Sequence, residues 1–165
     1  MMFSSEIKAL ATELGQLLLA RGETISTAES CTGGLISAAI TEIAGSSAWF
    51  ERGYITYANQ AKISLLDVPP AFIDGLGAVS EPVVAAMAQG AADGAAARWA
   101  VAVSGVAGPT GGSVDKPVGT VWFAFATPEG IHTEKQVFAG DRSAVRMATV
   151  YHALLRLVAL VKQAR

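Results

Sequence analysis

The stretch TAESCTGG, residues 27–34, decides how the rest of this chain is interpreted. It follows a short run of β-forming residues, 24–26, and precedes an apolar run with helical periodicity, 35–43. This order predicts a strand, a tight turn and a helix, with Ser30 at the carboxyl edge of a sheet. The N–H groups that start such a helix favour an anion or a developing oxyanion. Ser30 is therefore a candidate nucleophile, and the alternative is that Ser30 or Thr32 only caps the helix.

Three further residues of this turn bear on its chemistry. Gly33 and Gly34 remove side chains, so that a ligand can approach the backbone closely. Cys31 is the only cysteine of the chain, so no internal disulfide forms and a reducing compartment is expected. Cys31 is also a second candidate nucleophile, although such a cysteine usually needs a histidine partner and neither histidine can be placed beside it.

The composition predicts a single globular domain over residues 1–165. The chain is 52% hydrophobic and 16% charged, which excludes a disordered protein, and its net charge of −2 argues against a dedicated nucleic-acid binder. The N-terminus shows no apolar signal core, and charged residues interrupt the alanine-rich stretch 83–103. We therefore expect a cytoplasmic protein that interacts with neither membranes nor nucleic acids. Self-association into a homo-oligomer stays open.

Helical and strand patterns alternate along most of the chain and end in a hairpin. This order predicts an α/β fold, a three-layer α/β/α sandwich with a mixed sheet. The final helix is expected to bury Val150, Tyr151, Leu154, Leu155, Val158 and Val161. The expected elements are a helix capped by Ser4 or Ser5 and ended by Gly22, strand 24–28, helix 35–44, strand 49–57, helix 59–66, a helix capped by Ser80, strand 100–103, strands 120–126 and 131–138, and a final helix capped by Asp141.

Lys62 is the candidate base. Asn59 is expected to cap the short helix 59–66, which places Lys62 in its first turn. A cation is unfavourable there, which tends to lower the pKa of the lysine. A lower pKa is useful if Lys62 must act as a neutral base. The alternative is an ordinary solvated surface lysine.

Two more features favour ligand binding. The buried strand 100–103 runs into a glycine-rich loop, 104–113, which matches neither a Walker A loop nor a dinucleotide fingerprint. The alternative is a turn-rich connection. Arg142 and Arg146 share one face of the final helix near its start and could hold a phosphate or carboxylate, unless they are simply solvated.

The remaining chemistry is limited. His132 and His152 have no acidic partner close in sequence, and no Cys/His cluster has zinc spacing. A serine nucleophile with a lysine base remains as the activation scheme, and it requires no metal or cofactor.

Four blocks of sequence carry a family resemblance. TAESCTGG (27–34), GYITYANQAK (53–62), GAVSE (77–81) and SGVAGPTGGSVDKPVGTVW (104–122) together resemble the CinA C-terminal domain family. Many members carry a second, molybdopterin-binding-like domain, whereas this chain resembles the stand-alone, PncC-type amidohydrolases. The resemblance implies hydrolysis of nicotinamide mononucleotide to nicotinate mononucleotide and ammonia. It also implies that Ser30 is the nucleophile, Lys62 the general base and Tyr57 an assisting residue.

The substrate is expected to contact the same motifs. Backbone N–H groups near Thr32, Gly33 and Gly34 are expected to hold the oxyanion, and the 108–112 loop or Arg142 the phosphate. Two alternatives stay open, a catalytically silent nucleotide-binding or regulatory module and an amidase for another small amide. The expected substrate-binding residues are Cys31, Thr32, Gly33, Gly34, Asn59, Gly105, Gly108, Thr110, Gly111, Gly112 and Arg142.

Overall fold

A five-stranded mixed sheet organises the computed structural model, which describes residues 2–165. The strand order is β2-β1-β3-β4-β5; β1 pairs in parallel with β2 and β3, whereas β4 pairs antiparallel with β3 and β5. The predicted hairpin and the predicted central strand are therefore confirmed. The strands are β1 (Ile25–Glu29), β2 (Phe50–Ile55), β3 (Trp99–Gly105), β4 (Thr120–Thr127) and β5 (Gly130–Val137).

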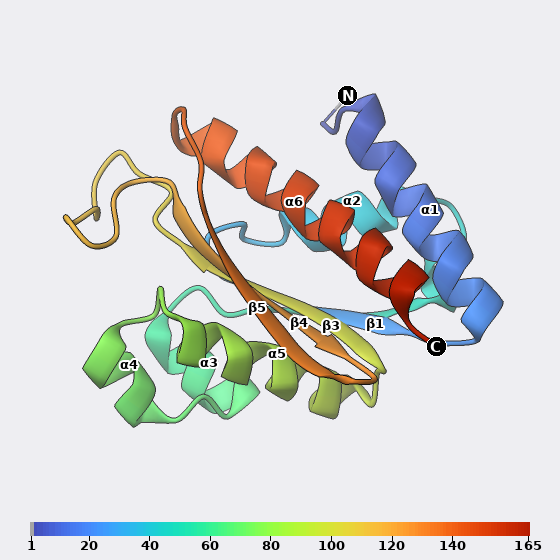
Figure 1. The fold of residues 1–165 in the computed structure, drawn as a ribbon, viewed down its shortest axis with the longest axis horizontal. Coiled ribbons are helices and arrows are strands. Elements are labelled where there is room, and N and C mark those ends of the chain that lie inside the picture. The colour runs from blue at the N-terminus through green and yellow to red at the C-terminus, as the bar shows by residue number, and fades with distance from the viewer. Residues whose placement is uncertain (1) are drawn as a thin grey trace.

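Helices cover both faces of this sheet, which confirms the three-layer α/β/α prediction (Figure 1). One face carries α1 (Ser5–Arg21), α2 (Leu35–Thr41) and α6 (Arg142–Gln163). The other face carries α3 (Asn59–Leu66), α4 (Pro70–Leu76) and α5 (Glu81–Ala95). A single 3₁₀ turn, η1 (Ser46–Ala48), precedes β2.

The strand residues divide between two cores according to the alternation of side chains along a strand. In β3, Trp99, Val101 and Val103 belong to the core beneath α1, α2 and α6, whereas Ala100 and Ala102 belong to the core beneath α5. The alanines on both α5 and β3 allow close packing between the helix and the sheet. Gly90 makes the contact with α3 equally tight, because a Cβ there would lie 2.2 Å from the Leu66 carbonyl oxygen.

The predicted helix ends are mostly confirmed. Ser4 caps α1 by accepting from the Ile7 N–H, and Asp141 caps α6 by accepting from the Ala144 N–H. Asn59 was a wrong cap prediction, because Ala58 occupies the N-cap position and Asn59 is the first residue of α3. The extended backbone of Ala58 lets the helix start without a side-chain cap.

The buried face of α6 is narrower than predicted. Val150, Leu154, Val158 and Val161 are buried, but Tyr151 and Leu155 are each 40% exposed. The two residues follow buried positions by one residue, which turns them about 100° away from the core around the helix. By length and composition α6 could cross a membrane, yet half of its most apolar window is buried inside the protein, as in a core helix.

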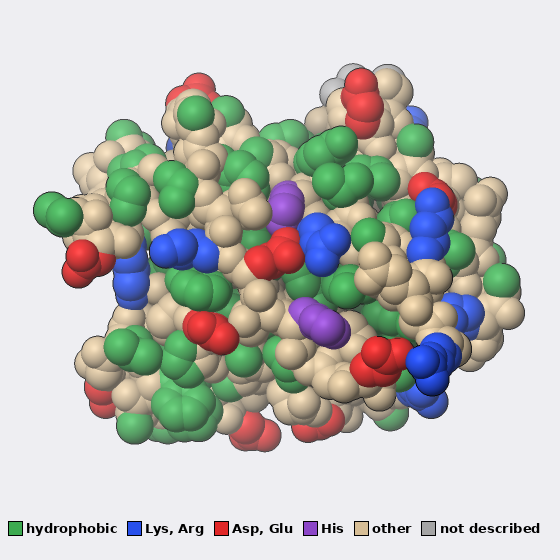
Figure 2. All heavy atoms as spheres, in the orientation of Figure 1, with side chains coloured by type: hydrophobic (Ala, Val, Ile, Leu, Met, Phe, Trp, Pro, Cys, Tyr) green, Lys and Arg blue, Asp and Glu red, His purple; other side chains and the backbone are tan. Residues whose placement is uncertain are grey.

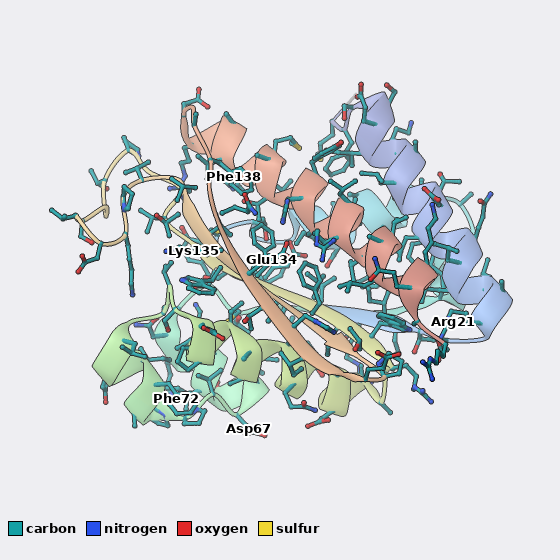
Figure 3. All side chains as sticks on the ribbon, in the orientation of Figure 1. Arg21, Asp67, Phe72, Glu134, Lys135 and Phe138 are labelled. Atoms are coloured by element: carbon teal, nitrogen blue, oxygen red, sulfur yellow. The ribbon has the colours of Figure 1, made fainter. Side chains whose placement is uncertain are left out.

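Side chains at the periphery connect the layers (Figure 3). Arg21, at the end of α1, donates to the Ala164 and Arg165 carbonyls and so holds the C-terminus. Glu134 on β5 reaches Arg156 of α6, while the neighbouring Lys135 lies over the Trp122 ring on the other face. Acidic and basic side chains are interspersed on the face drawn in Figure 2, in keeping with the small net charge.

Candidate active site

The structure brings Ser30 and Lys62 into direct contact. Ser30 follows β1 and Lys62 lies in α3, and the lysine Nζ is 2.9 Å from the serine Oγ. Both residues are buried, with 9% and 1% of their surface exposed. The serine is therefore held by a side chain 32 residues away in the sequence and is not merely a helix cap.

The ends of three parallel strands place the serine. The Ser30 N–H donates to the Val103 carbonyl at the end of β3, and the Thr56 N–H donates to the Glu29 carbonyl at the end of β1. The carboxyl ends of β2, β1 and β3 therefore meet at one sheet edge. This is the edge at which α/β proteins bind their ligands.

Lys62 has hydrogen-bond partners that suit a neutral base. Its Nζ also donates to the carbonyls of Thr56 at 2.7 Å and Tyr57 at 3.2 Å. A neutral amine has two N–H groups for these two carbonyls, so its lone pair is directed at the Ser30 hydroxyl. Burial lowers the pKa of Lys62 to about 8, and no carboxylate of residues 2–165 forms an ion pair with it. The main cause is desolvation, one of the two conditions that a lysine base was expected to need, besides the helix dipole.

Glu29 anchors the turn that carries Ser30. Its carboxylate accepts hydrogen bonds from the Thr32 hydroxyl at 2.7 Å, from the N–H groups of Ile36 and Ser37, and from the Ser37 hydroxyl. No role for Glu29 was predicted from the sequence, although an acidic residue shortly before a helix start is a signal for such an anchor. The helix N–H groups were expected to be open to an anion. That expectation was wrong for Ile36 and Ser37, because the protein supplies its own carboxylate.

Arg146 fixes the same turn from the opposite side. Its guanidinium donates to the Cys31 carbonyl at 3.0 Å and the Thr32 carbonyl at 3.1 Å, so it does not act as a solvated partner of Arg142. Within the turn, the Gly33 N–H donates to the Ser30 carbonyl. The N–H groups of Thr32 and Gly34 donate to no backbone acceptor within residues 2–165. These two groups remain as backbone donors for an oxyanion.

The side chains of Cys31 and Thr32 point away from this chemistry. Cys31 packs in the core beneath α1, α2 and α6, on the sheet face opposite to the one that Lys62 occupies. Burial raises the pKa of the Cys31 thiol to about 11, so the thiol stays protonated at neutral pH. The Thr32 hydroxyl is occupied by Glu29. The geometry therefore favours Ser30 over Cys31 as the nucleophile.

Tyr57 contacts Lys62 through its backbone only. Its side chain is 61% exposed, and its hydroxyl accepts a hydrogen bond from Arg142 at 3.1 Å. Arg142 also donates to the Gly108 carbonyl at 2.8 Å. The arginine thus joins the segment after β2 to the glycine-rich loop after β3. Asn59 lies exposed at the start of α3 and makes no side-chain hydrogen bond within residues 2–165.

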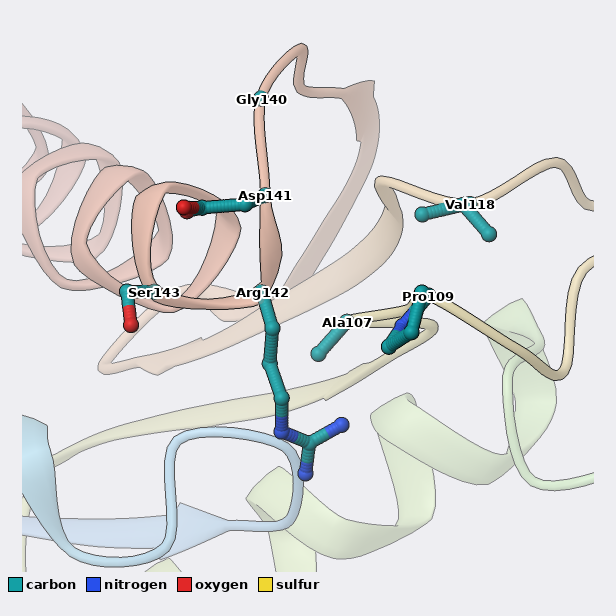
Figure 4. Close-up of a pocket in the computed structure, with 7 residues that line it drawn as sticks. All are labelled: Ala107, Pro109, Val118, Gly140, Asp141, Arg142 and Ser143. Carbon is teal, nitrogen blue, oxygen red and sulfur yellow. The ribbon is translucent and has the colours of Figure 1, made fainter.

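A cavity of about 440 Å³ lies beside Arg142 (Figure 4). In that view Arg142 extends from the start of α6 past Ala107 and Pro109, while Asp141 points back over the helix that it caps. Neither Ser30 nor Lys62 lines this cavity. The link between the cavity and this pair is Arg142, which lines the cavity and donates to the Tyr57 hydroxyl, while the Tyr57 carbonyl accepts from Lys62. Its lining residues are Ala107, Pro109, Val118, Gly140, Asp141, Arg142 and Ser143.

The glycines of the 104–113 loop are explained mainly by packing inside the protein. A Cβ on Gly105 would lie 2.6 Å from Val121, and one on Gly108 or Gly112 would lie 3.0 Å or less from Val118. Thr110 and Gly111 lie on the exposed part of the loop. Within residues 2–165 none of these loop residues makes a hydrogen bond to Ser30 or Lys62, and the Gly108 carbonyl accepts from Arg142 instead. Within residues 2–165 no group of three acidic, histidine or cysteine side chains is arranged to hold a metal ion.

Known proteins match this chain along nearly its whole length. It is 56% identical over 158 residues to nicotinamide-nucleotide amidohydrolase PncC of Escherichia coli strain K12, and the alignment covers 94% of this chain and 95% of that protein. It is 53% identical over 154 residues to nicotinamide-nucleotide amidohydrolase PncC of Pseudomonas putida, covering 93% and 96% of the two chains.

The fold also matches a solved structure, that of the competence/damage inducible protein CihA from Agrobacterium tumefaciens. The TM-score is 0.94 at 44% identity, and the match covers 98% of each chain. The model of the CinA C-terminal domain matches residues 7–161. The chain belongs to the CinA C-terminal domain family.

Proposed function

We propose that this protein hydrolyses the carboxamide of nicotinamide mononucleotide, giving nicotinate mononucleotide and ammonia, in the cytoplasmic salvage of pyridine nucleotides. The observation that carries the proposal is the 2.9 Å contact between Ser30 and a buried Lys62 that forms no ion pair with a carboxylate of residues 2–165. The relatives at 53% and 56% identity are nicotinamide-nucleotide amidohydrolases, and their activity supplies the proposed substrate. A binding module would not need a lysine of lowered pKa beside a serine, so this contact favours an enzyme.

The mechanism follows from the hydrogen bonds around Lys62. The Ser30 Oγ attacks the amide carbon while the neutral Lys62 takes the hydroxyl proton. The tetrahedral intermediate collapses, the C–N bond breaks, and Lys62 returns the proton to the leaving ammonia. Water then attacks the acyl-enzyme with Lys62 again as the base, which releases the carboxylate product and regenerates the Ser30 hydroxyl.

The substrate phosphate is proposed to bind Arg142. Its guanidinium is exposed, adjoins the cavity, and is connected through Tyr57 to the Lys62 side of the active site. Arginine binds phosphate oxygens through two parallel hydrogen bonds, which also orients the ligand. A phosphate at this position would compete with the Tyr57 hydroxyl for the guanidinium.

The direct test is ammonia release by the purified chain, measured with nicotinamide mononucleotide, nicotinamide riboside and free nicotinamide in the presence of a chelator. We expect ammonia release from the mononucleotide and a much lower kcat/KM for the two substrates that lack the phosphate. A folded protein that releases no ammonia from the mononucleotide would contradict the proposal.

Substitution of Arg142 tests the phosphate site separately. Arg142→Ala is expected to raise KM for the mononucleotide by about 10-fold or more with little change in kcat, because a charge-assisted hydrogen bond contributes roughly 1.5–3 kcal/mol. Hydrolysis of the riboside should change little. Arg156→Ala is the matched control, since this arginine lies on the same helix but binds Glu134. An unchanged KM for the mononucleotide in Arg142→Ala would place the phosphate elsewhere.

A further inference from the structure

Three hydroxyl side chains stand side by side at the carboxyl ends of the three parallel strands. Glu29 pairs with Ile55 on β2 and with Val103 on β3, so the next residues, Thr56, Ser30 and Ser104, are neighbours across the sheet edge. Adjacent strands are about 4.8 Å apart. Of the three hydroxyls, only that of Ser30 has a hydrogen-bond partner in residues 2–165.

Ser104 faces the side of the sheet on which Lys62 lies. It follows Ala100 and Ala102 in the strand alternation, and both alanines pack in the core beneath α5. The residue is 1% exposed, yet its Oγ makes no hydrogen bond within residues 2–165. Unlike the Thr56 hydroxyl, the Ser104 Oγ is not sealed inside the protein, so it keeps contact with solvent at this edge of the sheet. A ligand oxygen placed there can accept the hydrogen bond that no group within residues 2–165 accepts.

Lys62 approaches Ser30 from the opposite side. The two carbonyls that hold its Nζ belong to Thr56 and Tyr57, which follow β2, whereas Ser104 belongs to β3. The Thr56 hydroxyl lies on the lysine side and is sealed inside the protein. Because Lys62 must reach the leaving nitrogen, the carbonyl oxygen of the amide is directed to the other side of Ser30.

We propose that the Ser104 hydroxyl donates a hydrogen bond to the oxyanion of the tetrahedral intermediate, a proposal that rests on the proposed amide hydrolysis. When the Ser30 Oγ bonds to the amide carbon, the carbonyl electron pair moves onto the oxygen and the Ser30 proton moves to Lys62. Ser104 stabilises the negative oxygen together with backbone N–H groups of the 30–34 turn. When the C–N bond breaks, the electron pair returns to the carbonyl and the proton leaves with ammonia.

The test compares Ser104→Ala with Ser104→Thr and with Ser26→Ala. Ser26 is the matched control, because it is a buried serine on β1 whose hydroxyl does have a partner, the Ala91 carbonyl at 2.8 Å. We expect Ser104→Ala to lower kcat by about 10²-fold with KM little changed, because the bond forms only in the transition state. Its melting temperature should not fall, since no bond within the protein is lost. Ser26→Ala should show the reverse, a lower melting temperature with normal kcat, and Ser104→Thr should recover part of the activity.

A second measurement separates this proposal from the proposed substrate. A fluorophosphonate probe forms a P–O bond with an activated serine and expels fluoride, and its transition state also develops a negative oxygen. We expect Ser104→Ala to slow the labelling of Ser30 by a factor similar to the loss in kcat. If the wild type is labelled but releases no ammonia, the proposed function fails while the labelling rates still decide the role of Ser104. Labelling of Ser104→Ala at the wild-type rate, or a change in KM alone, would overturn the proposal.

Discussion

Ser30→Ala is expected to abolish ammonia release, lowering kcat by about 10⁴-fold or more. Removal of the nucleophile from a serine hydrolase leaves only the contribution of binding and of the oxyanion donors. Alanine fits the site, because Ser30 uses its hydroxyl only toward Lys62. The measurement is steady-state ammonia release by the wild type and the variant at equal concentration, with circular dichroism spectra recorded to confirm that both are folded.

Cys31→Ala is the control for this result. The Cys31 thiol is buried on the opposite sheet face and stays protonated, so its removal should leave kcat within a few-fold of the wild type. Its stability should fall by about 1 kcal/mol because a buried sulfur is lost. Activity that survives in Ser30→Ala but disappears in Cys31→Ala would make the cysteine the nucleophile and reject the serine mechanism.

The local features of this fold could be predicted because they depend on neighbouring residues. The turn after β1, the hairpin of β4 and β5, and the caps at Ser4 and Asp141 are each encoded within a few positions. The alternation between strands and helices then predicted the three layers. Tyr151 and Leu155 were wrongly predicted to be buried, because helical periodicity alone does not give the width of the buried face of α6.

The contacts within the site could not be predicted in the same way. The pairing of Ser30 with Lys62 depends on how α3 returns over the sheet, and no local pattern encodes that path. Motif resemblance implied the pair, but not the two carbonyls that direct the lysine lone pair. The glycines of the 104–113 loop were predicted to bind a ligand, although close contacts with Val118 and Val121 explain three of them. A glycine required for packing and one required for ligand approach have the same sequence pattern.

Lys62→Met is expected to remove activity as completely as Ser30→Ala, while the wild type shows a pH dependence that identifies the lysine as the base. Because Lys62 must be neutral to accept the serine proton, kcat/KM should rise with pH and level off above its pKa of about 8. Methionine keeps most of the side-chain volume but has no basic nitrogen. A wild-type profile that is flat from pH 6 to 9.5 would contradict this role for Lys62.

The same pKa makes a prediction about stability that is independent of any substrate. The folded-state pKa of Lys62, about 8, lies below the value of about 10.4 for an unfolded lysine, so between these values the unfolded chain binds more protons. The unfolding free energy of the wild type should therefore rise with pH across this window relative to Lys62→Met, by about 2 kcal/mol between pH 7.5 and 9.5. Chemical denaturation of both proteins at the two pH values measures the difference. If the two proteins change in parallel, Lys62 keeps an ordinary pKa in the folded state, and only a small fraction of the protein would then hold the base in its neutral form at neutral pH.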